Sequence, residues 1–280
     1  MTAMPRVPVL TYHAANVDGD SYAGNDHVAL AADLAMLARE GWRVVPAAWV
    51  AEQRLGLADR DLRRCVAITA DDGTVLDVDD VDWPGHGVQR GFLGALRDAA
   101  AAHPGFEPHL TSFVIADPVA RARMDDECLP GHGWMGEDWW PRAVASGGIE
   151  IGCHSWDHNH PVLAPAADGM PRGDFFAVDT DARARAQVDD ALAYIGARIA
   201  PARCRLFAYP YGHAGEFLRG EYLPRHGQRL GLLAAFGVQG EPVHAGSDPW
   251  ELPRYVCGWH WKTPGELQSI LAASRTPSTP

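Results

Sequence analysis

Short apolar runs alternate along the chain with longer stretches in which apolar residues recur at helical spacing. Short runs bounded by polar or glycine-rich segments are typical of buried strands. Strands are predicted over residues 7–12, 43–45, 65–69, 111–115, 150–153, 205–209, 232–235 and 252–256. The pattern therefore predicts many short strands that are separated by helices.

The first helical pattern begins at Val28, after Asp26, which we expect to cap the helix, and ends at Gly41. Further helices are predicted over residues 47–55, 88–102, a short stretch through Val144, 179–199, a segment from Gly215, and 264–273. Polar loops are expected over residues 74–87 and 161–174, and a Gly/Trp-rich insertion over residues 125–140.

Strands that alternate with helices predict parallel β/α units. The residues of most chemical interest directly follow strands, which is the face where β/α barrels carry their sites. Barrels often use about 250 residues as one domain, and this chain has 280. We therefore predict an α/β fold, a distorted or partial barrel of seven or eight units, with a single catalytic domain over residues 1–273 and a flexible tail over 274–280.

The net charge and the cysteine content of the chain exclude several kinds of partner and site. The chain has 24 Lys and Arg against 36 Asp and Glu, a net charge of −12 that repels nucleic acid and anionic membrane surfaces. The five cysteines are scattered and odd in number, which predicts neither a disulfide framework nor a zinc ribbon. Nucleic acid is excluded as an expected partner.

No apolar stretch is long enough to span a membrane, and the N-terminus has no apolar segment typical of a secretion signal. A soluble, cytoplasmic protein is the simplest expectation. A secreted protein whose signal peptide had been removed would have the same sequence, so that alternative stays open.

Three motifs bring chemically capable residues to predicted strand ends. His154 and His158 are four residues apart, so their rings can turn toward one cation if the chain curls there. A histidine pair alone is more often structural, but the Asp71-Asp72-Gly73 motif supplies the carboxylate that a metal site needs. The third motif, residues 209–212, is a Tyr-Pro-Tyr-Gly turn whose backbone N–H could face a substrate oxygen.

In their order along the chain, which is Asp71-Asp72-Gly73, then His154 to His158, then residues 209–212, the motifs resemble those of polysaccharide deacetylases with a NodB homology domain, also called carbohydrate esterase family 4. The resemblance covers roughly residues 7–273. The family's usual C-terminal Leu-x-x-His motif is found instead at residues 10–13. This arrangement is similar to the circularly permuted branch of the family, whose members resemble exopolysaccharide deacetylases acting on poly-N-acetylglucosamine.

The resemblance implies roles for individual residues. Asp72, His154 and His158 would hold Zn²⁺ or another divalent transition metal such as Co²⁺ or Ni²⁺. Asp71 would be the general base that takes a proton from the attacking water, and the backbone N–H of Tyr211 would stabilise the oxyanion.

His13 would be the general acid that protonates the leaving amine. A capping histidine at a strand end is the alternative for His13, and His260 near the C-terminus is its rival as the acid. The arginine that usually steadies the catalytic aspartate is replaced by Ala208, and we expect Arg254 to take its place from a neighbouring strand.

Aromatic residues are the candidates for sugar binding. We expect contacts from Tyr209, Trp134, Trp259 and Trp261, although core packing is the alternative for at least half of the ten tryptophans.

The predicted function is a metal-dependent hydrolase that removes N-acetyl or similar small acyl groups from the amino sugars of a glycan. One alternative is the same chemistry on a lipid-linked sugar or an O-acetyl ester. Another is a degenerate member that binds glycan without hydrolysing it, which the missing arginine at Ala208 motivates.

Overall fold

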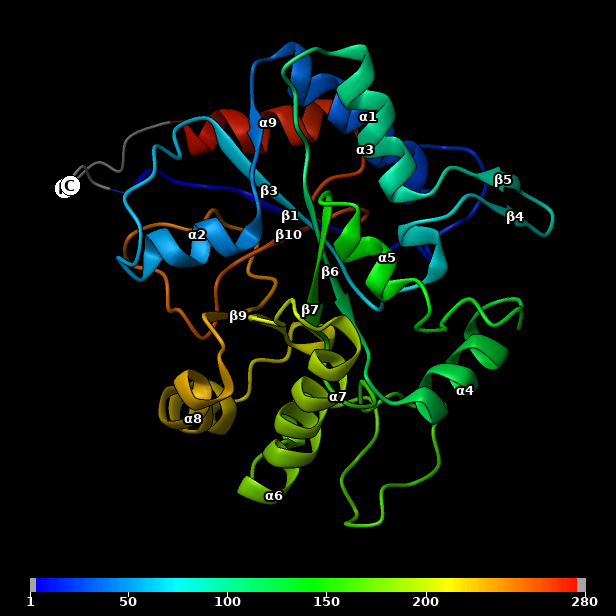
Figure 1. Ribbon diagram of the computed structural model, residues 1–280, viewed down its shortest axis with the longest axis vertical. Helices are drawn as coiled ribbons and strands as arrows, with labels where there is room; N and C mark the ends of the chain where they lie inside the picture. The colour runs from blue at the N-terminus through cyan, green and yellow to red at the C-terminus, as the bar shows by residue number, and fades with distance from the viewer. Residues whose placement is uncertain (1–3, 276–280) are drawn as a thin grey trace.

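The fold is built around a sheet of eight strands, all paired in parallel (Figure 1). It is seen in a computed structural model that describes residues 4–275. The strands run in the order β10-β1-β3-β6-β7-β8-β9, and β2 pairs with β3 beside this path. Their bounds are β1 (Val9–Tyr12), β2 (Arg43–Val44), β3 (Cys65–Ala70), β6 (Leu110–Val114), β7 (Ile149–Cys153), β8 (Leu206–Ala208), β9 (Ala234–Phe236) and β10 (Tyr255–Val256).

The two edges of the sheet are joined through the segment that precedes β10. Leu252 N–H donates to Ala235 of β9 at 2.8 Å, and Gly237 N–H donates back to Leu252 at 2.9 Å. The same segment continues into β10, which pairs with β1. The sheet therefore curls into a distorted parallel barrel, as predicted.

Alternate side chains of the strands point to opposite faces, which separates two cores. Leu10, Ile68 and Phe207 belong to a large cluster that includes residues of the surrounding helices. Val9, Ala67 and Phe236 belong to a second cluster with residues of α2. The helices are α1 (Asp26–Arg39), α2 (Ala47–Arg54), α3 (Phe92–Ala102), α4 (Pro118–Cys128), α5 (Trp140–Ala145), α6 (Asp181–Ala184), α7 (Asp190–Ile199), α8 (Leu223–Leu230) and α9 (Pro264–Ser274).

The N-terminus of α1 corrects the expected cap. The side chain of Asn25, not that of Asp26, accepts from the first backbone N–H groups of the helix. Asp26 instead accepts the backbone N–H of His13 at 2.7 Å and a side-chain N–H of Asn16 at 2.7 Å. The carboxylate thus ties the end of β1 to the start of α1.

Two expected loops contain regular structure. Residues 74–87 were expected as a loop, but a hairpin of β4 (Val81–Trp83) and β5 (Gly87–Gln89) lies there, so α3 begins at Phe92 rather than at residue 88. The insertion over 125–140 includes the end of α4, which lacks a clear apolar stripe because its buried face includes Arg121 and Asp125.

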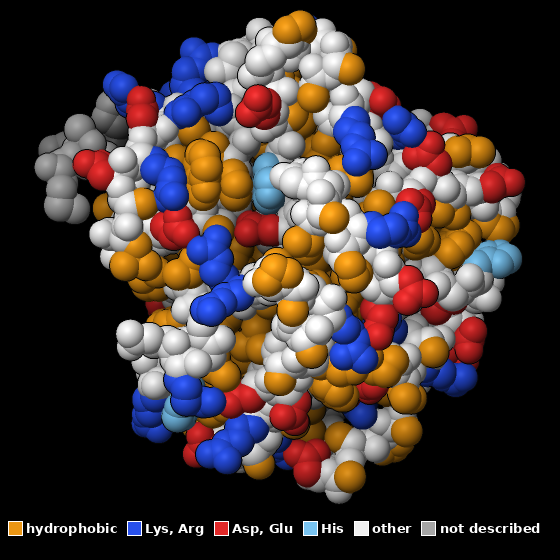
Figure 2. Space-filling view, in the orientation of Figure 1, with side chains coloured by type: hydrophobic (Ala, Val, Ile, Leu, Met, Phe, Trp, Pro, Cys, Tyr) orange, Lys and Arg blue, Asp and Glu red, His pale blue; other side chains and the backbone are white. Residues whose placement is uncertain are grey.

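The helix over 179–199 is interrupted by a π-helical turn, Arg185–Asp189. The expected tail does not begin at Ser274, which is the last residue of α9, and residues 276–280 lie outside the described part of the chain. None of the described helices is long and apolar enough to cross a membrane. Basic and acidic side chains are interspersed on the face shown in Figure 2.

Candidate metal centre

The polar candidates follow the carboxyl ends of different strands. His13 comes directly after β1, Asp71 and Asp72 follow β3, His154 follows β7, and Tyr211 follows β8. Because the strands are parallel, these ends meet on one side of the barrel. They surround a cavity of about 340 Å³. Its lining residues are His13, Asp71, Asp72, Met124, His154, His158, His160, Tyr211, Gly212, Val238, Val256 and Trp259.

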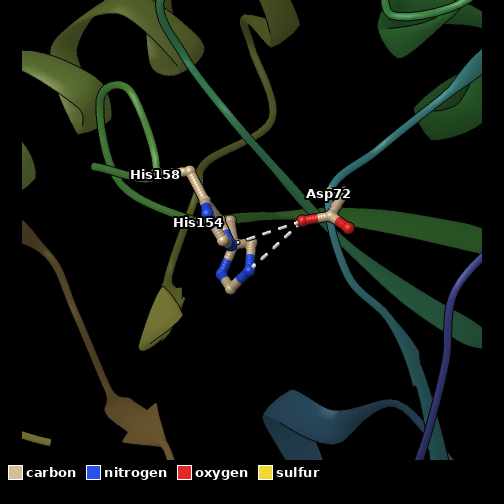
Figure 3. A group of neighbouring side chains, drawn as sticks. All are labelled: Asp72, His154 and His158. Atoms are coloured by element: carbon tan, nitrogen blue, oxygen red, sulfur yellow. Dashed lines mark ion pairs between the residues drawn. The ribbon is translucent and has the colours of Figure 1, made fainter. Parts of the chain in front are cut away.

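Asp72, His154 and His158 bring three ligand atoms within 4.8 Å of one another. The Asp72 carboxylate points toward the two imidazoles, with Oδ1 at 3.7 Å from His154 Nε2 and 3.5 Å from His158 Nε2 (Figure 3). These distances exceed those of ordinary hydrogen bonds. Tetrahedral Zn²⁺ with bonds of about 2.1 Å separates its ligand atoms by about 3.4 Å, so the three residues fit a divalent ion.

The hydrogen bond of His154 and the burial of His158 also suit a metal. His154 Nδ1 lies 2.8 Å from the carbonyl oxygen of Ala208, to which it donates, and this leaves the Nε2 lone pair free. Burial, and secondly the neighbouring His154, lower the pKa of His158 to about 3 against the opposing effect of Asp72. His158 is therefore neutral at neutral pH, the form that binds metal.

Backbone strain gathers at this site. Six described residues other than glycine have positive φ, and five of them lie here: Asp72 (73°), Ser155 (70°), His158 (58°), Asn159 (47°) and Tyr211 (59°). Non-glycine residues adopt this conformation at a cost of about 1–3 kcal/mol, and they concentrate at functional sites. The strained residues of the described chain thus gather in the strand-end turns that carry Asp72, His158 and Tyr211.

The turn from His154 to Asn159 is no regular helix, and buried hydrogen bonds hold its shape. Asp157 accepts from Asn159 N–H at 2.9 Å, from Arg172 at 2.6 Å and from Gln187 at 2.8 Å. Gln187 lies in the π-helical turn. Thus the chain does curl as a metal site requires, with Asp157 at the centre of the supporting contacts.

Asp71 is held by Arg254. The guanidinium donates to both carboxylate oxygens, at 2.7 Å to Oδ1 and 2.9 Å to Oδ2, and both side chains are buried. Burial acts to raise the pKa of Asp71, but Arg254 and then His154 outweigh it, so that the pKa lies well below its usual range. Asp71 is a carboxylate at neutral pH, with Oδ2 at 4.0 Å from His154 Nε2.

Comparison with known proteins agrees with this geometry. A family model described as polysaccharide deacetylase matches residues 59–222, which is more than half of the chain. The chain belongs to the polysaccharide deacetylase family. The matched range contains Asp71, Asp72, His154, His158 and Tyr211, whereas His13 and Arg254 lie outside it. A search of curated proteins found no significant match.

Solved structures share the fold of this chain. IcaB from Ammonifex degensii is 19% identical with a TM-score of 0.66, and the match covers 97% of this chain and 98% of that one. The deacetylase PplD of Streptococcus pyogenes, solved with acetate, is 13% identical with a TM-score of 0.63, covering 96% and 99%. A de-N-acetylase from Aggregatibacter actinomycetemcomitans is 14% identical with a TM-score of 0.61, covering 95% and 99%.

His13 and its rival His260 have different surroundings. His13 lines the cavity beside Asp71. His260 is not among the lining residues, and its Nδ1 accepts the backbone N–H of Val256 at 2.8 Å. The geometry therefore favours His13 as the histidine that can reach a substrate.

Two expected sugar contacts are wrong. Tyr209 is fully buried and its hydroxyl donates to the carbonyl oxygen of Trp250 at 2.7 Å. Trp261 is 1% exposed and its Nε1 donates to the Tyr22 hydroxyl at 2.9 Å. Both side chains belong to the core cluster, so neither can stack on a sugar.

Of the other two expected sugar contacts, only Trp259 lines the cavity. Trp134 contacts the rings of Trp83 and His132, at centroid distances of 5.0 Å and 5.1 Å, and does not line the cavity. Trp259 lines it with 64% of its surface exposed.

Sequence reasoning missed His160, Met124 and Val238 among the lining residues. Only His160 had a usable signal, because it stands two residues after a proposed metal ligand. Val238 meets the Tyr211-Gly212 turn, where a Cβ at Gly212 (φ 69°) would lie 2.1 Å from Val238 Cγ2. No sequence pattern predicts the contact between Val238 and Gly212.

Proposed function

We propose that this protein is a metal-dependent hydrolase that removes N-acetyl or similar small acyl groups from the amino sugars of a glycan. The observation that carries the proposal is the Asp72, His154 and His158 triad beside the Arg254-bound carboxylate of Asp71, in one cavity. The printed names of two fold relatives, a de-N-acetylase and a deacetylase solved with acetate, support this reaction class.

Asp72, His154 and His158 would hold the divalent ion, with Zn²⁺, Co²⁺ and Ni²⁺ as candidates. One carboxylate and two imidazoles are a ligand set that catalytic zinc uses. When bound, the ion would polarise the acyl carbonyl and make water more acidic. Ala208 and Asp157 contribute by fixing the two histidine-bearing positions through their hydrogen bonds.

Asp71 serves as the general base. Its carboxylate is ionised, lines the cavity and is prevented from rotating by the two hydrogen bonds from Arg254. It accepts a proton from the attacking water. Arg254 thus supplies the support that Ala208 cannot give, which argues against a degenerate, non-catalytic member.

Tyr211 and His13 complete the reaction. The backbone N–H of Tyr211 donates to the oxygen that becomes negative when water adds to the acyl carbon. His13 then protonates the amine nitrogen as the C–N bond breaks, and the acid is released. His13 is positioned by its backbone N–H, which donates to Asp26.

Acetate release tests this function. Purified protein is incubated with Zn²⁺, Co²⁺ or Ni²⁺ and with oligomers of N-acetylglucosamine, and acetate is measured for wild type, Asp71→Asn and the exposed control Asp61→Asn. We expect release by wild type and by the control, and a loss of about 10²–10⁴-fold in Asp71→Asn with metal retained. Wild-type protein that binds metal but releases acetate from no N-acetylated sugar would contradict the proposal.

A further inference from the structure

Exposed aromatic rings concentrate around the catalytic cavity. Among the described residues, the large apolar side chains with considerable exposure are Trp49, Leu57, Val88, Val119, Phe176, Tyr211 and Trp259. Of the four aromatic ones, Tyr211 and Trp259 line the cavity. Phe176 connects to it through a row of rings, because His213 lies 4.3 Å from Phe176 and 5.3 Å from Tyr211 between centroids. Tyr211 in turn lies 4.5 Å from His158.

The exposed rings of Phe176 and Trp259 share one arrangement, in which an imidazole covers one side of the ring. Phe176 stacks on His213 with an interplanar angle of 15°, and 53% of its surface remains exposed. Trp259 lies over His260 at 4.6 Å and 30°, and 64% of it remains exposed. Each ring is therefore backed by an imidazole, while more than half of the residue's surface stays open to solvent.

Hydrogen bonds fix both arrangements. Asp174 caps the turn of Phe176 by accepting its N–H at 2.9 Å, and the carbonyl oxygen of Asp174 accepts from the Asn159 side chain at 2.9 Å. His260 accepts the N–H of Val256 at 2.8 Å. Phe176 is thus anchored to the turn that carries His158. A ligand that binds these rings has no loop to order, which favours affinity.

We propose that the Phe176 and His213 pair is a binding subsite for a sugar ring, separate from the cavity rim at Trp259. A single linear glycan would contact both, so the protein would bind several linked sugars and act within a chain. The flat, apolar face of a pyranose suits an open aromatic ring. The continuity of the ring row with the metal centre identifies the occupant as part of the same glycan. This inference rests on the proposed function.

Substrates of different length distinguish binding at this subsite from the hydrolysis step. KM and kcat for acetate release are measured on a dimer and a pentamer of N-acetylglucosamine, and pentamer binding to metal-free protein is measured by calorimetry. The variants are Phe176→Ala and Phe176→Leu. Trp49→Ala is the matched control, because Trp49 is an exposed ring packed on Arg60 that does not line the cavity.

We expect Phe176→Ala and Phe176→Leu to raise KM for the pentamer about tenfold, with kcat and the dimer unaffected, and to weaken pentamer binding equally. Trp49→Ala should match wild type. Equal effects on dimer and pentamer, or none, would overturn the subsite. Full activity of the Leu variant would show a general apolar contact, such as a lipid tail, and would overturn it too. A wild type that binds the pentamer through Phe176 without releasing acetate would instead refute the proposed function alone.

Discussion

Asp71 and Asp72 are neighbours in the chain, but they have different surroundings. Asp71 is 6% exposed and both of its carboxylate oxygens are bound by Arg254. Asp72 has a φ of 73°, which turns its carboxylate toward the two histidines. Two adjacent acids can therefore divide the proposed work, since one backbone turn separates a proton acceptor from a metal ligand.

Arg254→Lys tests the support of Asp71. Lysine keeps the positive charge but cannot bind both carboxylate oxygens in a planar fork. We expect acetate release to fall by about tenfold to a hundredfold while metal content stays at the wild-type level, because the metal ligands are untouched. Arg63→Lys, which changes an exposed arginine, is the control. Unchanged activity in Arg254→Lys would show that orientation of Asp71 by the guanidinium is unnecessary.

The buried carboxyl of Asp33 should make the free energy of unfolding depend on pH. This carboxyl accepts from Tyr12 and Tyr22, and burial outweighs these bonds and raises its pKa from 3.8 to about 6. Between these values the folded state keeps a proton that the unfolded state has released, so the free energy of unfolding falls as pH rises through this window. The total change is about 3 kcal/mol.

Asp33→Asn removes this titration. Wild type should lose about 3 kcal/mol of unfolding free energy between about pH 4 and about pH 7, whereas the variant should not. The difference in unfolding free energy, variant minus wild type, should therefore rise by about 3 kcal/mol over this range, as measured by urea unfolding. The exposed Asp20→Asn serves as control. A difference between Asp33→Asn and wild type that does not vary with pH would refute the assignment.

At the scale of elements, the turn after β7 carries both histidines of the proposed metal site, and hydrogen bonds to Asp157 hold its shape. Asp157→Asn weakens the contacts to Arg172 and the Asn159 N–H that hold His158 in a left-handed conformation. We expect metal affinity to fall about 10–100-fold, as measured by competition with a chelator. Asp168→Asn is a matched control, since it loses an aspartate–arginine pair with Arg183 away from the ligands. Equal affinities in both variants would contradict the role of Asp157.

Most elements could be predicted from the sequence because apolar periodicity reports burial directly. The predicted strand over 65–69 became β3 and the predicted helix over 264–273 became α9. The β4–β5 hairpin and α4 were missed for physical reasons. The hairpin is largely exposed, and the buried side of α4 mixes Arg121 and Asp125 with Ala120 and Met124, so that it has no continuous apolar stripe.

At the scale of the whole molecule, residues far apart in the sequence complete one site. The motif residues could be found because they follow strands that the pattern predicts. Arg254 and Asp71 are 183 residues apart, and their contact was expected only from the family resemblance. The Phe176 and His213 pair had no sequence signal, because ring stacking depends on how two loops meet in space.

Closure of the barrel depends on Leu252. This fully buried residue lies in the segment that precedes β10, and its backbone is hydrogen-bonded to Ala235 of β9 and to Gly237. Leu252→Ala should lower the free energy of unfolding by about 2–5 kcal/mol, because it leaves a cavity between the sheet edges. Chemical denaturation measures this, with the exposed Leu57→Ala as control. A loss no larger than that of Leu57→Ala would show that the edges are held by other contacts.

Metal content tests whether Asp72, His154 and His158 hold a divalent ion. Elemental analysis is made on wild type, Asp72→Ala, His154→Ala and the control His160→Ala, after incubation with Zn²⁺, Co²⁺ or Ni²⁺. His160 lines the same cavity but is not one of the three clustered ligands. We expect about one metal ion per chain in wild type and in the control, and none in the other two variants. No metal in wild type, or metal retained without Asp72 and His154, would contradict this expectation.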